Sequence, residues 1–119
     1  MAEYKLGMME MRFADLIWNS EPLSSGELVK LCEKELSWKK STTYTILRRL
    51  CERGIFRNRD GTVTSRISKQ EFNAMQSEKF LEETFDGSLP QFITAFAMRK
   101  KLSNKEIDVL QKFIDENRR

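Results

Sequence analysis

No histidine occurs anywhere in the 119-residue chain. A neutral imidazole is the usual general base near neutral pH and a common zinc ligand, so its absence removes the commonest routes to hydrolytic and metal-dependent catalysis. No paired carboxylates, phosphate-binding glycine loop or group of metal ligands stands out in the sequence either. We therefore expect a protein that is not an enzyme and that holds no metal ion or other cofactor.

Cysteines and long apolar runs are also scarce. Cys32 and Cys51 are the only cysteines, each in a segment with a helical pattern, and we expect two reduced thiols rather than a disulfide or a metal-binding pair. No run approaches the ~18 consecutive apolar residues of a membrane span. The segment Met1–Glu10 does not have the pattern of a signal peptide. These absences predict a soluble, cytoplasmic protein that does not bind membranes.

The net charge of +3 is small, but the charge is unevenly distributed. From Lys39 to Arg66 there are eight basic and two acidic residues, which gives this stretch a net charge of +6. Such asymmetry is typical of a surface that faces a polyanion such as nucleic acid. A basic face that is simply solvated is the alternative interpretation.

The first half of the chain carries the pattern of three short helices. Apolar spacing predicts a helix over Met8–Trp18. A capping box formed by Ser24 and Glu27 opens a second helix, which ends near Leu36. A third helix is expected from about Ser41 to Arg53, followed by a glycine that favours a left-handed helix end.

A hairpin follows the third helix. Asp60-Gly61 supplies the positive φ angles of a tight two-residue turn between two short segments rich in β-branched and basic residues. A helix-turn-helix that continues into such a hairpin is a winged-helix arrangement. The predicted fold is mainly α with a small β-hairpin: a winged helix-turn-helix DNA-binding domain over residues 1–68 and a helical dimerisation region over residues 69–119.

The third helix has two chemically different faces. Thr43, Leu47 and Leu50 share a face with Ile46, and this face must pack on the preceding helices. The opposite face carries hydroxyl groups and arginines, which can bond base edges and phosphates in a DNA major groove. A solvated helix face and a hairpin kept soluble by its charge are the alternatives. The candidate DNA-binding residues of this segment and the hairpin are Lys39, Lys40, Ser41, Thr42, Thr45, Arg48, Arg49, Arg57, Arg59 and Arg66.

The remaining chain, from Ser68 to Arg119, contains nine basic and nine acidic residues and is electrically neutral. Capping boxes that begin at Ser68 and Ser103, and an apolar stripe that begins at Leu89, predict three more helices. Helices this short cannot bury their apolar residues alone, so we expect a homodimer; helices that fold back on their own domain are the alternative. The candidate dimerisation residues are Phe72, Phe80, Leu89, Phe92, Ile93, Phe96, Ile107, Leu110 and Ile114.

From Leu6 onward the chain resembles the BlaI/MecI family of penicillinase repressors. The resemblance rests on the segments Met8–Glu10, Leu16–Trp18, Leu23–Leu28, Trp38–Leu50, Arg53-Gly54, Phe92–Phe96 and Leu102–Ile107. It implies a dimer bound to inverted repeats near a promoter. It also implies DNA contacts at Ser41, Thr42, Thr45 and Arg49, with the wing on phosphates.

The resemblance also implies a mode of release and a protease as a partner. Repressors of this family leave DNA after a membrane metalloprotease that senses β-lactams leads to a cut in the dimerisation region. The bond cut there is typically Asn-Phe and corresponds to Ala95-Phe96, so this chain lacks the asparagine. The cysteine-rich C-terminal motif of copper-responsive relatives is missing as well.

Two functions remain open from the sequence. The chain is either a dimeric transcriptional repressor that recognises a palindromic double-stranded operator, with β-lactam-resistance genes as its targets, or a winged-helix interaction module. In the second case its basic face would bind an acidic protein or RNA. Salt dependence and a preference for a particular duplex separate the two.

Overall fold

The structure is a computed structural model that describes residues 6–118 and divides into two compact units. The first unit ends at Ser77, the second begins at Glu78, and each is described by itself below. Residues 1–5, part of the segment in which no signal peptide is expected, lie outside the described residues. The predicted domains, residues 1–68 and 69–119, concern DNA binding and dimerisation and stay predictions.

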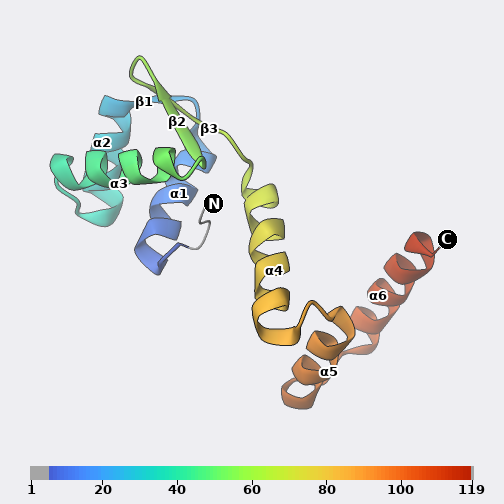
Figure 1. Cartoon of the computed structure of the whole chain (residues 1–119). Helices are drawn as coiled ribbons and strands as arrows, with labels where there is room; N and C mark the ends of the chain where they lie inside the picture. The colour runs from blue at the N-terminus through green and yellow to red at the C-terminus, as the bar shows by residue number, and fades with distance from the viewer. Residues whose placement is uncertain (1–5, 119) are drawn as a thin grey trace. The chain divides into compact units, whose positions relative to one another are not determined.

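The first unit is a three-helix arrangement with a small sheet (Figure 1). Its elements are α1 (Met8–Ser20), β1 (Leu23–Ser24), α2 (Ser25–Leu36), α3 (Lys40–Glu52), β2 (Phe56–Arg59), β3 (Thr62–Ser65) and the first turns of α4 (Lys69–Phe85). α2 and α3 form the predicted helix-turn-helix, and the predicted hairpin follows it. The capping box is confirmed, since the Glu27 amide donates to Ser24 Oγ at 3.0 Å and the Ser24 amide to Glu27 Oε1 at 3.0 Å.

The sheet has three antiparallel strands in the order β1-β3-β2. The turn between β2 and β3 is as predicted, with Asp60 at φ 52° and Gly61 at φ 84°. β1 is an addition that the sequence did not predict: Leu23 lies opposite Val63 at the start of β3. A strand of two residues is too short to show the alternation by which strands are recognised.

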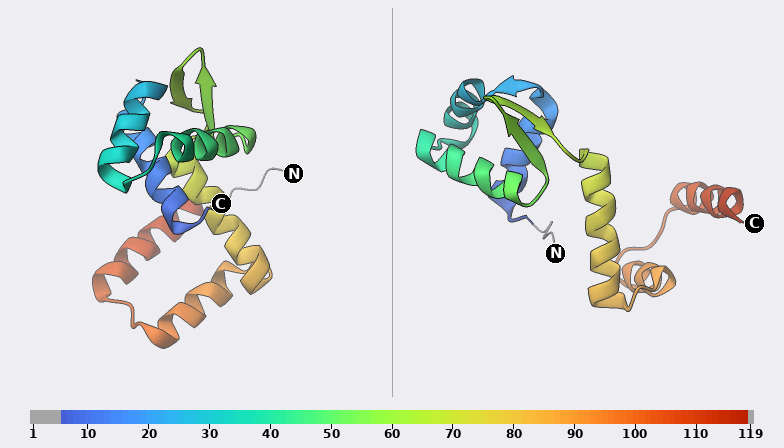
Figure 2. Two further views of the ribbon diagram at one scale, coloured as in Figure 1. Left: turned by 90° about the vertical axis from the view of Figure 1, so that its left-hand side faces the viewer. Right: turned by 45° about the horizontal axis from the view of Figure 1, so that its top comes forward.

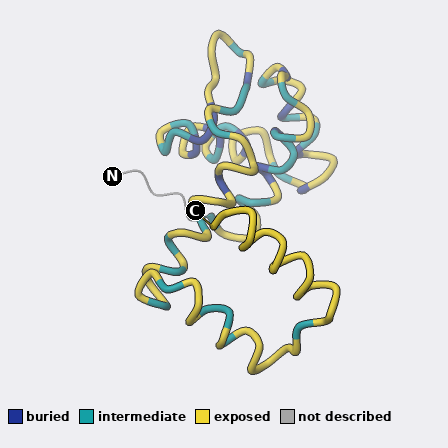
Figure 3. The backbone as a smooth tube through the Cα atoms, turned by 90° about the vertical axis from the view of Figure 1, so that its right-hand side faces the viewer, coloured by how far each residue is buried: buried dark blue, intermediate teal, exposed yellow. Residues whose placement is uncertain are grey.

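The core of the first unit lies where the three helices meet the sheet (Figure 3). Aromatic rings pack against one another here: Phe13 stacks on Trp38 with ring centroids 5.4 Å apart, and Trp18 and Phe56 lie 5.3 Å apart with their rings tilted. Burial of this apolar surface is what holds α3 against its neighbours. The buried hydrophobic residues are Phe13, Ala14, Ile17, Leu23, Leu28, Cys32, Leu36, Leu47, Leu50, Ile55, Phe56, Val63 and Phe72.

Phe72 is in this core, which corrects the prediction that it lies in the dimerisation surface. Its side chain is 0% exposed, and its ring centroid is 5.5 Å from that of Trp18. Two polar contacts fix the same region: Trp18 Nε1 donates to the Ile67 carbonyl at 3.1 Å, and Lys69 Nζ lies 2.9 Å from Asp15 Oδ1. The first turn of α4 therefore completes the core of the first unit, and the Phe72 side chain is not available to a partner.

The second unit consists of the end of α4, α5 (Leu89–Arg99) and α6 (Asn104–Asn117), which Figure 2 shows from two further sides. Phe85 and Phe92 are 5.6 Å apart at their ring centroids, and Phe80 and Phe96 extend the cluster. The predicted helix starts are confirmed, with Ser103 Oγ accepting from the Glu106 amide at 3.1 Å. Between residues 73 and 118, however, no side chain is buried.

Both cysteines are free, as the sequence predicts. Burial raises the pKa of the Cys32 thiol and of the Cys51 thiol, so both remain protonated at neutral pH. Within residues 6–118, every helix is too short or too polar to span a lipid bilayer.

Candidate nucleic-acid interface

The candidate reading helix, α3, begins at Lys40, one residue before the predicted start. Lys39 occupies the N-cap position with extended backbone and makes no capping hydrogen bond from its side chain. The first turns of α3 are tied to α2 by a side-chain contact, in which the Tyr44 hydroxyl donates to Ser25 Oγ at 3.3 Å. The helix end that carries Lys39 and Lys40 is thus exposed and positively charged, as an anion-binding helix start should be.

The two faces of α3 are arranged as predicted. Thr43, Leu47 and Leu50 are at most 2% exposed and pack into the core. Thr45 and Arg48 are exposed on the other side of the helix. The Thr45 hydroxyl donates to the Ser41 carbonyl at 2.9 Å, which leaves its oxygen able to accept a hydrogen bond from a ligand.

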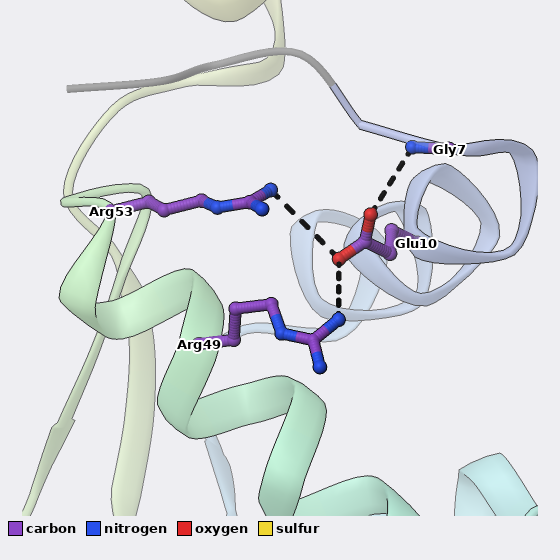
Figure 4. Close-up of polar contacts among 4 residues, drawn as sticks. All are labelled: Gly7, Glu10, Arg49 and Arg53. Carbon is purple, nitrogen blue, oxygen red and sulfur yellow. Dashed lines mark hydrogen bonds and ion pairs between the residues drawn. The ribbon is translucent and has the colours of Figure 1, made fainter.

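Arg49 is exposed as well, but it has a protein partner that the sequence did not reveal (Figure 4). Arg49 Nη1 lies 3.6 Å from Glu10 Oε2, and Arg53 Nη1 lies 3.9 Å from the same oxygen. The other oxygen, Glu10 Oε1, accepts from the Gly7 amide at 3.2 Å at the start of α1. Glu10 lies far from both arginines in sequence, so only the packing of α1 on α3 brings the three side chains together.

The hairpin presents two arginines on one face. Arg57 lies opposite Thr64 and Arg59 opposite Thr62 in the ladder of β2 and β3, and these four side chains line one shallow pocket with Asp60. Residues two apart in a strand share a face. The prediction that Arg57 and Arg59 lie on the same face of the hairpin is therefore confirmed. Guanidinium and hydroxyl groups that lie side by side can both donate hydrogen bonds to phosphate oxygens.

α3 and the hairpin meet at a pocket of about 300 Å³. Its lining includes Arg48 from α3 and Asn58 from β2, together with Tyr44, Leu47 and Cys51. The exposed face of α3 is therefore continuous with the hairpin. Arg48 stands at their junction.

The predicted DNA-binding residues are all exposed. α3 and the segment before it carry seven of them, and Arg57 and Arg59 share the hairpin face. Arg66 follows the end of β3 at Ser65, so strand pairing does not place it on that face. Sequence reasoning missed Glu10, which touches the predicted contact residue Arg49.

A helix-turn-helix with an exposed polar face, followed by a basic hairpin, defines a winged helix-turn-helix protein. A sequence model of the penicillinase repressor family matches residues 6–116, and the chain belongs to this family. The resemblance inferred from the sequence is thereby confirmed. Members of this family are transcriptional repressors, so the chain is a repressor and not an enzyme.

Relatives match over almost their whole length. The penicillinase repressor of Bacillus licheniformis is 26% identical over 113 residues, which cover 92% of this chain and 88% of the relative. The methicillin resistance regulatory protein MecI of Staphylococcus aureus is 21% identical over 117 residues, 95% of each chain. A penicillinase repressor of Staphylococcus aureus is 22% identical over 118 residues, covering 96% of this chain and 94% of the relative.

Proposed function

We propose that the chain is a homodimeric repressor that binds a palindromic operator in double-stranded DNA and controls β-lactam-resistance genes. The exposed face of α3 reads bases in the major groove, and the hairpin binds phosphates. The carrying observation is the division of α3 into a buried face, where Leu47 is 2% exposed, and an exposed face with Thr45 and Arg48. Two relatives, a penicillinase repressor and a methicillin resistance regulatory protein, support resistance genes as the targets.

The chemistry of the exposed surface favours DNA over a solvated face. Ser41, Thr42 and Thr45 are poor helix formers that a purely structural surface would replace by alanine, lysine or glutamate. Their short side chains allow a helix to approach base edges closely, and Arg48 has the length to bond guanine with two hydrogen bonds. Lys39 and Lys40 at the helix start add positive charge where a phosphate backbone would pass.

The second unit supports the dimer. Met98 is 82% exposed, Val109 62% and Phe113 61%, and no residue among 73–118 is buried. Apolar surface of this extent on neutral helices is typical of an interface between subunits. A second copy would cover it and bring two α3 helices to a two-fold symmetric operator.

The predicted dimerisation residues of the second unit fall into two groups. Phe92 and Ile93 are half-buried, and Phe92 belongs to the aromatic cluster with Phe80. Those that remain exposed and available for a partner are Phe80, Leu89, Phe96, Ile107, Leu110 and Ile114.

Release by proteolysis belongs to the same proposal. The Ala95-Phe96 bond lies inside α5, between Leu89 and Arg99, so a cut there separates α6 from the rest of the chain. A peptide bond within a helix reaches a protease only after local unfolding, and the second unit, in which no side chain of residues 78–118 is buried, is suited to such opening. Loss of α6 would remove Ile107, Leu110 and Ile114 from the dimer surface.

A binding experiment tests the proposal. A duplex operator, selected in vitro from a random library, is expected to be bound at least about a thousandfold more tightly than random duplex. The logarithm of the affinity should fall with the logarithm of salt concentration by about 0.9 for each phosphate neutralised. Fluorescence anisotropy with DNA duplexes, an RNA duplex and an acidic protein separates the candidates. Preference for RNA or the acidic protein, without duplex selectivity, would contradict the repressor function.

A further inference from the structure

Glu10 places a carboxylate against the exposed arginine of the reading helix. Its Oε2 lies between the guanidinium groups of Arg49 and Arg53, at 3.6 and 3.9 Å (Figure 4). The Arg49 side chain is 49% exposed, whereas that of Glu10 is 19% exposed. Arg49 is thus held from the protein side while its other side is open to an incoming anion.

We propose that Glu10 limits binding of the protein to non-specific DNA, because its carboxylate competes with a DNA phosphate for Arg49. This inference rests on the proposed function. In the free protein Arg49 pairs with Glu10, and a phosphate gains that arginine only by replacing the carboxylate. The binding free energy for non-specific DNA is therefore less favourable than it would be if Glu10 did not pair with Arg49.

The geometry of the contact is suited to exchange. Glu10 Oε2 is buried but has no hydrogen-bond partner, so the arginines hold it by charge at distances longer than a hydrogen bond. Because the Arg49 side chain is 49% exposed, a phosphate oxygen can reach it from solvent, and Arg53 still lies beside Glu10 Oε2 when Arg49 turns to the phosphate. Screening by salt weakens the pair and the phosphate contact together, so the competition is most visible at low ionic strength.

The two oxygens of Glu10 have separable roles. Oε1 accepts from the Gly7 amide and closes the first turn of α1, and Oε2 faces the arginines. Glutamine at this position retains a carbonyl oxygen for the Gly7 amide and removes the negative charge. Glu10→Gln is therefore expected to keep α1 in place and to release Arg49.

Random-sequence duplex DNA is the probe for the test, bound to the full chain by fluorescence anisotropy across a salt series. Glu10→Gln is expected to bind this duplex about threefold to tenfold more tightly at low salt. The slope of log affinity against log salt should become more negative by about 0.9, which corresponds to one additional phosphate contact.

Glu71→Gln is the matched control. Glu71 closes the start of α4, where its Oε1 accepts from the Ser68 amide at 3.3 Å, and the substitution changes the net charge by the same amount. Its affinity for random duplex should stay within about twofold of the unsubstituted protein. In the double variant Glu10→Gln/Arg49→Gln the additional slope should disappear, because the released arginine is no longer there.

Unchanged affinity and slope in Glu10→Gln, or a gain that persists in the double variant, would overturn the inference while leaving the proposed function intact. Glu10→Asp keeps the charge but shortens the side chain, so it should bind random duplex about twofold more tightly than the unsubstituted protein. This variant replaces Glu10→Gln in the test if the glutamine variant fails to fold. Absence of duplex binding by every protein, the unsubstituted one included, would contradict the proposed function and this inference with it.

Discussion

A chain that lacks Leu89–Arg119 is expected to be monomeric and to bind its operator at least about a hundredfold more weakly than the full chain. The deletion removes α5 and α6, which carry most of the exposed apolar side chains of the second unit. Two linked α3 helices bind two half-sites with an avidity that a single helix cannot reach. Analytical ultracentrifugation gives the mass, and titration of the selected duplex gives the affinity.

The fluorescence of the tryptophans is the control for this deletion. Trp18 and Trp38 both lie in the first unit, so an unchanged emission spectrum shows that the DNA-binding unit is still folded. Affinity for random duplex should fall much less than affinity for the operator, since a monomer retains the basic surface of α3 and the hairpin. A truncated chain that sediments as a dimer and binds the operator fully would refute the assignment of dimerisation to α5 and α6.

Phe72→Ala is expected to lower the free energy of unfolding of the first unit by about 3–5 kcal/mol. The Phe72 ring is fully buried against Trp18, and its removal leaves a cavity where α4 joins the core. Urea unfolding followed by tryptophan fluorescence measures this change, because Trp18 reports on the contact itself.

Met8→Ala is the matched control for Phe72→Ala. Met8 also belongs to the first unit, but its side chain is 83% exposed, so its truncation should change the unfolding free energy by less than about 0.5 kcal/mol. A Phe72→Ala protein as stable as the unsubstituted one would mean that α4 does not belong to this core. It would also favour the prediction from sequence that Phe72 lies in the dimerisation surface.

Local chemistry made most of the fold predictable. Ser24 and Ser103 mark helix starts because their hydroxyls accept the free amides of the first turn, and this interaction depends on residues three positions apart. Asp60-Gly61 marks the hairpin because both positions need a positive φ angle. The faces of α3 follow from helical periodicity alone, so Thr43 was expected inside and Thr45 outside.

The features that escaped prediction depend on contacts distant in sequence. β1 exists because Leu23 meets Val63 across the sheet, and Phe72 is buried because Trp18 is beside it. The apolar spacing of α4 could show that Phe72 lies on an apolar face but not which surface covers it. The pairing of Glu10 with Arg49 likewise required the packing of α1 against α3.

The most direct test of the central claim, that the exposed face of α3 binds DNA, is the affinity of Thr45→Glu for the selected operator. A carboxylate there would face bases and phosphates, and the account predicts a loss of about a hundredfold or more. Ser77→Glu is the control, since Ser77 is an exposed helical hydroxyl with the same bond to the carbonyl four residues earlier, at 3.0 Å. It should bind within about twofold of the unsubstituted protein. Operator binding by Thr45→Glu equal to that of the unsubstituted protein would contradict the claim.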